Sequence, residues 1–226
     1  MRNILKNTTS SIVVLVAFAF INFKAQAQTY LPVGPQTNVP VATVTDGGWT
    51  ECYRDTYDIH MDADTVLSAC PESQLMLSCR ETGSPTLTLL AQGNRSDVTF
   101  DTGNDNNDVT HIANGVGWYF NNTGGGDDGN AWGFVRAGDI VDKDNCDTND
   151  SGANNERLCW HLNDAGGYRC GVMESLNSST EYERIVYQAT AEPEMVPTLS
   201  EWGLICMAAI LGIVGFMVMR RRKVTA

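Results

Sequence analysis

LMLSC at residues 75–79 and TLTLL at residues 86–90 are the two stretches that decide the fold class of this chain. Leucines and a cysteine occupy every second position of the first stretch, which places them on one face of a β-strand. The second stretch repeats this alternation, and so does DIHMDAD at residues 58–64. No window of the chain carries a long amphipathic helical stripe. The three stretches therefore predict strands.

Shorter strand-like segments continue this pattern through the rest of the chain. They are residues 98–100 (VTF), 117–120 (GWYF), 132–135 (WGFV), 157–161 (RLCWH) and 184–187 (RIVY). Clusters of Gly, Asn and Asp separate them, as turns do. Many short strands between turns favour an all-β fold, namely a single disulfide-stabilised β-sandwich or a barrel-like domain.

The N-terminus has the pattern of a signal peptide. Arg2 and Lys6 precede an apolar run of ten residues, IVVLVAFAFI at 12–21, and AQA at 25–27 gives a cleavage site before Gln28. The alternative is a membrane anchor. Ten residues rise only about 15 Å as a helix, which is half the thickness of a bilayer core and argues against it.

The C-terminus contains a longer apolar segment. Residues 203–219 (GLICMAAILGIVGFMVM) are uncharged and would reach about 25 Å as a helix, near the lower limit for spanning a bilayer. A membrane stop of four basic residues follows, made by Arg220, Arg221, Arg222 and Lys223. The positive-inside rule places these residues in the cytoplasm and the preceding domain outside. The sequence predicts one C-terminal transmembrane helix rather than a buried core helix.

A short motif stands directly before the apolar segment. It consists of Val196, Pro197, Thr198, Leu199, Ser200, Glu201, Trp202 and Gly203. Together with the apolar run and the basic cluster, it resembles the IPTL-CTERM protein-sorting domain of the PEP-CTERM and exosortase group, with valine in place of the first isoleucine. The resemblance implies recognition by an exosortase, a membrane-embedded cysteine transpeptidase, and delivery to the cell surface or extracellular matrix. It covers only about the last 30 residues.

These features divide the chain into five parts. We expect a signal peptide at 1–27, an extended lead-in with three prolines at 28–47, and a β-rich ectodomain at 48–188. A stalk at 189–195 and the sorting, membrane and cytoplasmic segment at 196–226 complete the chain. The precursor would be tethered to the inner membrane before it reaches the surface.

The charge of the exported region limits its partners. Residues 28–197 hold 26 acidic and eight basic residues. Such a surface repels phosphate backbones, so we expect no nucleic-acid partner.

Six cysteines lie in the exported region: Cys52, Cys70, Cys79, Cys146, Cys159 and Cys170. An even number in a secreted domain predicts three disulfides, and 15 connectivities are open. We prefer Cys70–Cys79, Cys146–Cys159 and Cys52–Cys170, because the first two close short loops. Zinc is the alternative, but no C-x-x-C pair occurs.

An acidic loop at residues 142–152 (DKDNCDTNDSG) is a candidate calcium site. Asp147, Asn149 and Ser151 place oxygens on alternate residues before a glycine, as the opening of a calcium loop does. The expected glutamate falls at Leu158, so the full EF-hand pattern fails. The alternative is a solvated turn, and we expect no other cofactor.

Aromatic residues among Asn and Asp are candidates for glycan binding, because sugar C–H faces stack on rings while hydroxyls need polar partners. The four candidates are Trp118, Tyr119, Trp132 and Trp160. The alternative is that they are core residues. Residues 69–79 (ACPESQLMLSC) are also similar to the opening of rhamnose-binding, sea-urchin-egg-lectin-like domains. The later tyrosine-glycine-arginine element of that family is replaced here by Gly93-Asn94-Arg95.

No catalytic motif is evident. The three histidines are far apart in the sequence, and there is no G-x-S-x-G, P-loop or dinucleotide fingerprint. We therefore expect a non-enzymatic surface or matrix protein whose ectodomain binds a glycan or another surface component. The alternatives are a secreted carboxylate-dependent hydrolase and a purely structural surface module.

Overall fold

The computed structural model describes residues 30–103, 109–122, 130–143, 146–147, 154–162, 167–190, 209–211 and 213. The chain separates into two compact units, Met1–Thr190 and Ala191–Ala226. All the strands and helices described below belong to the first unit, to which the term ectodomain refers from here on.

The first sheet has five antiparallel strands in the order β1-β4-β3-β10-β2. They are β1 (Gln36–Pro40), β2 (Thr50–Thr56), β3 (Gln74–Glu81), β4 (Thr86–Asn94) and β10 (Tyr182–Ala189). The two stretches that decided the fold class form the β3–β4 hairpin, in which Leu77 lies opposite Ala91. Leu75 and Leu77 face one hydrophobic cluster and Met76 faces another, so β3 is buried on both faces.

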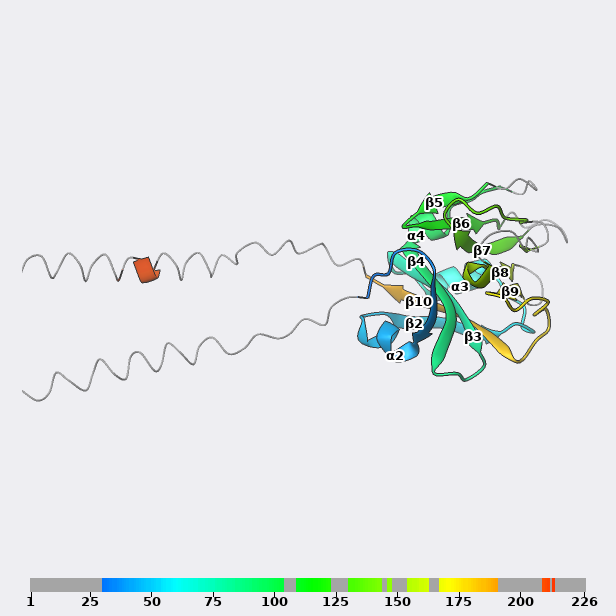
Figure 1. Ribbon diagram of the computed structural model, residues 1–226, viewed down its shortest axis with the longest axis horizontal. Coiled ribbons are helices and arrows are strands. Elements are labelled where there is room, and N and C mark those ends of the chain that lie inside the picture. The colour runs from blue at the N-terminus through cyan, green and yellow to red at the C-terminus, as the bar shows by residue number, and fades with distance from the viewer. Residues whose placement is uncertain are drawn as a thin grey trace, which may run out of the picture. The chain divides into compact units, whose positions relative to one another are not determined.

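The second sheet is a simple meander in the order β5-β6-β7-β8-β9. Its strands are β5 (His111–Ala113), β6 (Val116–Phe120), β7 (Ala131–Arg136), β8 (Leu158–His161) and β9 (Gly167–Cys170). Asn114 and Gly115 link β5 to β6, and both have positive φ angles of 52° and 73°. Asn-Gly is the pair that tolerates this conformation in a two-residue hairpin turn. Figure 1 shows the strands of this sheet grouped apart from β2, β3, β4 and β10.

Side chains from both sheets form one hydrophobic core. Leu77, Leu89 and Val186 come from the first sheet, and Trp118 and Trp132 come from the second. A separate cluster covers the other face of the first sheet. The structure therefore confirms a mostly β fold with two antiparallel sheets.

The helical segments are short. They are α2 (Val41–Asp46), α3 (Ala63–Ala69), α4 (Arg95–Val98) and the 3-10 turn η1 (Asn154–Glu156). The predicted strand at 58–64 is wrong, because α3 begins within it. The carboxylate of Asp62 accepts hydrogen bonds from the backbone N–H groups of Asp64 and Thr65, which is the usual cap of a helix start. The strand predicted at 98–100 is also wrong, since Val98 ends α4.

In the described part of the expected extended lead-in, residues 30–47, the structure contains a strand and a short helix instead. Val39 of β1 lies opposite Leu87 of β4, and Val44 of α2 is fully buried in the second cluster. Pro40 does not prevent strand formation because β1 is an edge strand, where a residue without an N–H group is tolerated, and Pro32 and Pro35 precede the strand. Of the expected stalk at 189–195, Ala189 and Thr190 belong to this unit, and 191–195 lie outside the described residues.

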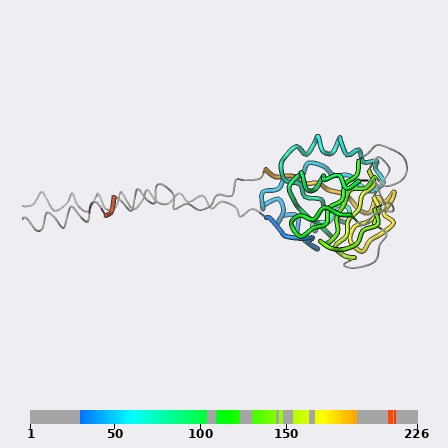
Figure 2. The backbone as a smooth tube through the Cα atoms, turned by 90° about the horizontal axis from the view of Figure 1, so that it is seen from above, coloured from blue at the N-terminus to red at the C-terminus, as the bar shows by residue number. Residues whose placement is uncertain are grey.

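Both ends of the described ectodomain lie at the same end of the first sheet. The Tyr30 N–H donates to the Gly47 carbonyl, and Thr50, three residues further on, lies opposite Gln188 of β10. The blue start and the orange end of the ectodomain emerge on the same side in Figures 1 and 2.

In the part of the chain that the structure describes, no helix has the length and apolar character needed to cross a membrane. Of the membrane helix predicted at 203–219, only residues 209–211 and 213 are described.

Candidate functional site

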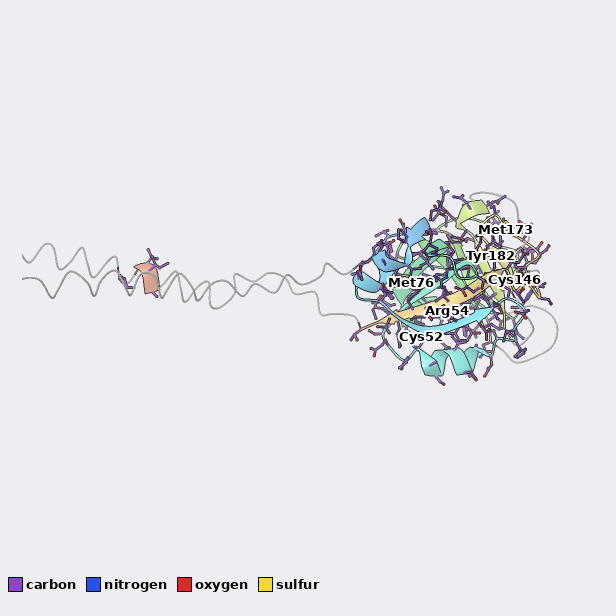
Figure 3. All side chains as sticks on the ribbon, turned by 90° about the horizontal axis from the view of Figure 1, so that it is seen from below. Cys52, Arg54, Met76, Cys146, Met173 and Tyr182 are labelled. Atoms are coloured by element: carbon purple, nitrogen blue, oxygen red, sulfur yellow. A yellow bond between two sulfur atoms is a disulfide. The ribbon has the colours of Figure 1, made fainter. Side chains whose placement is uncertain are left out.

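Three disulfides stabilise the ectodomain, as the cysteine count predicted. They are Cys52–Cys70, Cys79–Cys170 and Cys146–Cys159, with Cα–Cα distances of 5.3, 5.9 and 5.4 Å. The pairing Cys146–Cys159 is confirmed, whereas Cys70–Cys79 and Cys52–Cys170 are wrong. In Figure 3, Cys52 lies near Arg54 on β2, and Cys146 lies in the region of the second sheet.

The physical reason for the wrong pairings is the direction of the Cys79 side chain. Cys79 is buried on the face of β3 that contacts the core between the sheets, and Cys170 ends β9 of the opposite sheet. Cys70 directly follows α3, and α3 contacts β2, the strand that carries Cys52. Short loop length is a weaker constraint than the face on which a strand presents its cysteine.

The four aromatic candidates for ligand binding are all fully buried, with exposures of 0 % for Trp118, Tyr119, Trp132 and Trp160. Trp132 and Trp160 contact each other edge to face at 5.8 Å, and Trp132 Nε1 donates to the Val98 carbonyl at 3.0 Å. They offer no ring face to a glycan in this structure. Their role is packing, which corrects the expectation of a binding surface.

Tyr119 is also a structural residue. Its hydroxyl donates to the Leu158 carbonyl at 2.7 Å and so joins β6 to β8 across β7. Gly133 of β7 allows this, because a Cβ there would stand 2.5 Å from the Tyr119 hydroxyl oxygen. Burial raises the pKa of Tyr119 well above its ordinary value, so the hydroxyl remains a donor at neutral pH.

The candidate calcium ligand Asp147 is bound to an arginine. Its carboxylate is fully buried and accepts two hydrogen bonds from Arg157 Nη1, at 2.8 and 2.9 Å. Burial raises the pKa of Asp147, and the charge of Arg157 acts in the opposite direction. A calcium ion at this carboxylate would have to displace the guanidinium. Asn149 and Ser151 lie outside the described residues.

A second arginine completes this buried cluster. Arg169 Nη1 donates to the Asp147 carbonyl at 2.9 Å, and its Nη2 lies 2.9 Å from a carboxylate oxygen of Glu174. The cluster lies beside the Cys146–Cys159 disulfide and holds Asp147 against Arg157, directly before β8, and Arg169 of β9. In the described part of the chain, no group of three His, Cys, Asp or Glu residues could hold a metal ion.

A pocket of about 300 Å³ lies where the first sheet meets the turn between β5 and β6. Three parts of the chain form the pocket walls. The first is the start of β3 together with the end of β4 and α4, the second is the β5–β6 turn at Asn114, and the third is the segment before β1. Its lining residues are Leu31, Gln74, Gln92, Gly93, Asn94, Asp97 and Asn114. Most of them carry an amide or a carboxylate, so the pocket is polar.

A chain of hydrogen bonds orders one wall of the pocket. Gln74 Nε2 donates to Asn94 Oδ1 at 2.7 Å, and Asn94 Nδ2 donates to Asp97 Oδ2 at 3.0 Å. The other oxygen of Asp97 lies 2.8 Å from His111 Nε2. The His111 ring stacks on Phe100, with a centroid distance of 4.3 Å. These contacts connect the side chains of this wall from β3, through β4 and α4, to β5.

The opposite wall is ordered by backbone carbonyls. Asn114 Nδ2 donates to the carbonyls of Pro32 and Gln92, at 2.9 and 3.0 Å. Gln92 Nε2 donates to the same Pro32 carbonyl at 2.9 Å. These bonds hold the segment before β1 against the two sheets.

Motif analysis missed this pocket because its residues are scattered polar groups at strand ends. The available signal was the register of the β3–β4 hairpin, which brings Gln74 opposite Asn94. His111, one of three histidines noted in the sequence, reaches the pocket wall only because Asp97 of α4 lies beside β5.

The sorting motif at 196–203 and the membrane stop at 220–223 lie outside the described residues. Comparison with curated proteins and with solved structures gives no match. Residues 196–222, however, match the family model of the IPTL-CTERM motif, which confirms the resemblance and is consistent with a C-terminal sorting domain.

Proposed function

We propose that this chain is an exported bacterial surface or matrix protein, that an exosortase-type enzyme processes its C-terminus, and that its ectodomain is a non-enzymatic binding module. The observation that carries the proposal is the match of residues 196–222 to the IPTL-CTERM motif. The order of segments supports it: a signal-peptide pattern, a domain with three disulfides, then the motif, an apolar run and a basic cluster.

The disulfides support an exported domain in particular. Disulfides persist in oxidising compartments and are rare in the cytosol. The Cys79–Cys170 bond connects residues 91 positions apart and is fully buried, so it belongs to the folded core rather than to a surface redox site.

For the ectodomain, the ligand we propose is a glycan or another surface component. The polar pocket supports a binding module. Asp97 is the one carboxylate among its lining residues, whereas most glycoside hydrolases use two facing carboxylates. This favours binding over the alternative of a carboxylate-dependent hydrolase. A purely structural module is the third proposal. Detection of a bound ligand would favour the binding module over the structural one.

Processing can be tested by making the chain in a Gram-negative host that has an exosortase of this class, and in the same host without it. We expect the intact mass of the mature protein to correspond to loss of residues 1–27 in both hosts. A further C-terminal mass loss or modification should occur only with the enzyme. An identical C-terminus in both hosts would contradict the proposal.

A further inference from the structure

We propose that the pocket bordered by Gln74, Asn94, Asp97 and Asn114 binds a neutral saccharide. This inference rests on the proposed binding function of the ectodomain and identifies its site and ligand class. The carbohydrate candidates from the sequence, the buried tryptophans, play no direct part in it.

The hydrogen-bonding groups of the pocket suit adjacent hydroxyls. Each amide has two N–H donors and an oxygen acceptor, and the internal bonds use only part of this capacity. Gln74 donates once, and Asn94 accepts once and donates once, within the wall. Their remaining donors and acceptors can pair with neighbouring sugar hydroxyls, each of which both donates and accepts.

Charge favours a neutral sugar over an acidic one. The pocket is lined by the Asp97 carboxylate and by no lysine or arginine. The exported region around it is strongly acidic, with 26 acidic and eight basic residues in 28–197. A sialylated, sulfated or phosphorylated ligand would therefore be repelled, and its anionic group would find no cation in the lining.

Apolar side chains beside the polar wall suit the C–H faces of a sugar ring. Leu31 lines the pocket and is 55 % exposed. Phe100 is 49 % exposed and stacks on His111, which in turn contacts Asp97. Unlike the buried tryptophans, the Phe100 ring has surface available for contact, although it stands at the outer end of the series Asn94–Asp97–His111 and not in the pocket lining.

The pocket is also preorganised. Gln74 and Asn94 lie opposite each other at the end of the β3–β4 hairpin, and Asn114 lies in a two-residue turn. Because strand pairing and the bonds to Pro32 already fix these groups, little conformational entropy is lost when a ligand binds.

The test is a glycan array of defined neutral and acidic oligosaccharides. It is probed with the full-length chain, purified in a detergent without a sugar headgroup. The strongest array ligand is then measured by calorimetry against variants. We expect neutral glycans to bind and acidic ones not to bind. Asn94→Ala and Gln74→Ala should each weaken binding about ten-fold, because they remove amides that contact the ligand.

Asn177→Ala is the matched control. Asn177 is exposed in the loop before β10 begins. Gln74 of the pocket lies opposite Ala189, at the other end of β10, so the two positions are well separated along this strand. This variant should bind like the unmodified chain. Asp97→Asn is a second test because it keeps the side-chain shape. Weaker glycan binding by this variant, with an unchanged unfolding midpoint, would support the site even if an alanine variant folds poorly.

The outcomes separate the site from the function. Neutral-glycan binding that the pocket variants leave unchanged would overturn the site and leave the proposed binding function intact. Selective binding of acidic glycans would overturn the ligand class. No binding to any glycan would overturn this inference together with the glycan part of the proposed function.

Discussion

Cys79 on β3 and Cys170 at the end of β9 are joined by a disulfide that links the first sheet to the second, although 91 residues separate them in the chain. Both side chains are fully buried in the core that the two sheets share. The bond therefore closes the longest loop of the three disulfides and holds the core together.

Removal of this bond should destabilise the protein more than removal of a short-range one. A loop of 91 residues predicts a loss of about 4.5 kcal/mol for Cys79→Ala with Cys170→Ala, and a separation of 13 predicts about 3 kcal/mol for Cys146→Ala with Cys159→Ala. Urea unfolding followed by circular dichroism measures both. Equal losses in the two variants would show that loop closure does not govern their stability.

Trp132 should behave as a core residue. It is fully buried, donates to the Val98 carbonyl and contacts Trp160 and Phe120 edge to face. Trp132→Ala should lower the free energy of unfolding by about 3–5 kcal/mol in denaturant titration. Phe100→Ala, at a half-exposed aromatic residue, is the control and should cost about 1 kcal/mol or less. Similar costs for the two would contradict the assignment of Trp132 to the core.

Arg157 should be required for stability because it neutralises a buried carboxylate. Arg157→Met leaves Asp147 without the Nη1 group that donates to both of its carboxylate oxygens and should cost about 3–5 kcal/mol in the same titration. Arg136→Met is the matched control, since Arg136 pairs with Glu156 at the surface and should change stability little. A small effect of Arg157→Met, together with a higher unfolding midpoint in calcium, would mean that Asp147 serves an ion instead.

Asp62 should make stability depend on acid pH. Its bonds to Thr65 and Asp64 lower the pKa of the carboxyl below its ordinary value. A lowered pKa in the folded state stabilises the fold above the ordinary value, and this contribution is lost as the pH falls through the folded pKa.

Asp62→Asn keeps a side-chain oxygen at the cap but cannot ionise. Wild type should therefore exceed this variant in free energy of unfolding at about pH 6, and the difference should shrink at about pH 2.5. Denaturant titrations at the two pH values measure it. A difference that stays constant would show that ionisation of Asp62 does not contribute.

Local alternation was sufficient to predict much of the fold. The leucines of β3 and β4 have the period of a strand and a turn between them, so the hairpin follows from residues that are close in sequence. The alternation at 58–64 failed because Asp62 caps a helix, and a side chain that bonds backbone N–H groups can override hydrophobic period.

The candidate site depended on long-range contacts that the sequence does not encode locally. Cys79 pairs with Cys170 only because the sheets face each other, and Asp97 meets His111 only when α4 lies beside β5. The buried position of Trp118 and its neighbours likewise follows from sheet packing. Aromatic and amide composition suggested a binding surface but could not distinguish core rings from exposed ones.

The central claim, that the C-terminal motif sorts this chain to the surface, is tested most directly by one measurement: the fraction of the protein accessible to external protease in a host with the matching exosortase. Proline disfavours the helical conformation in the residue before it, and we expect the processing enzyme to recognise an extended segment. We predict that Pro197→Ala lowers this fraction several-fold, while Pro193→Ala, in the stalk just before the motif, leaves it unchanged. Equal surface exposure of wild type and Pro197→Ala would contradict the claim.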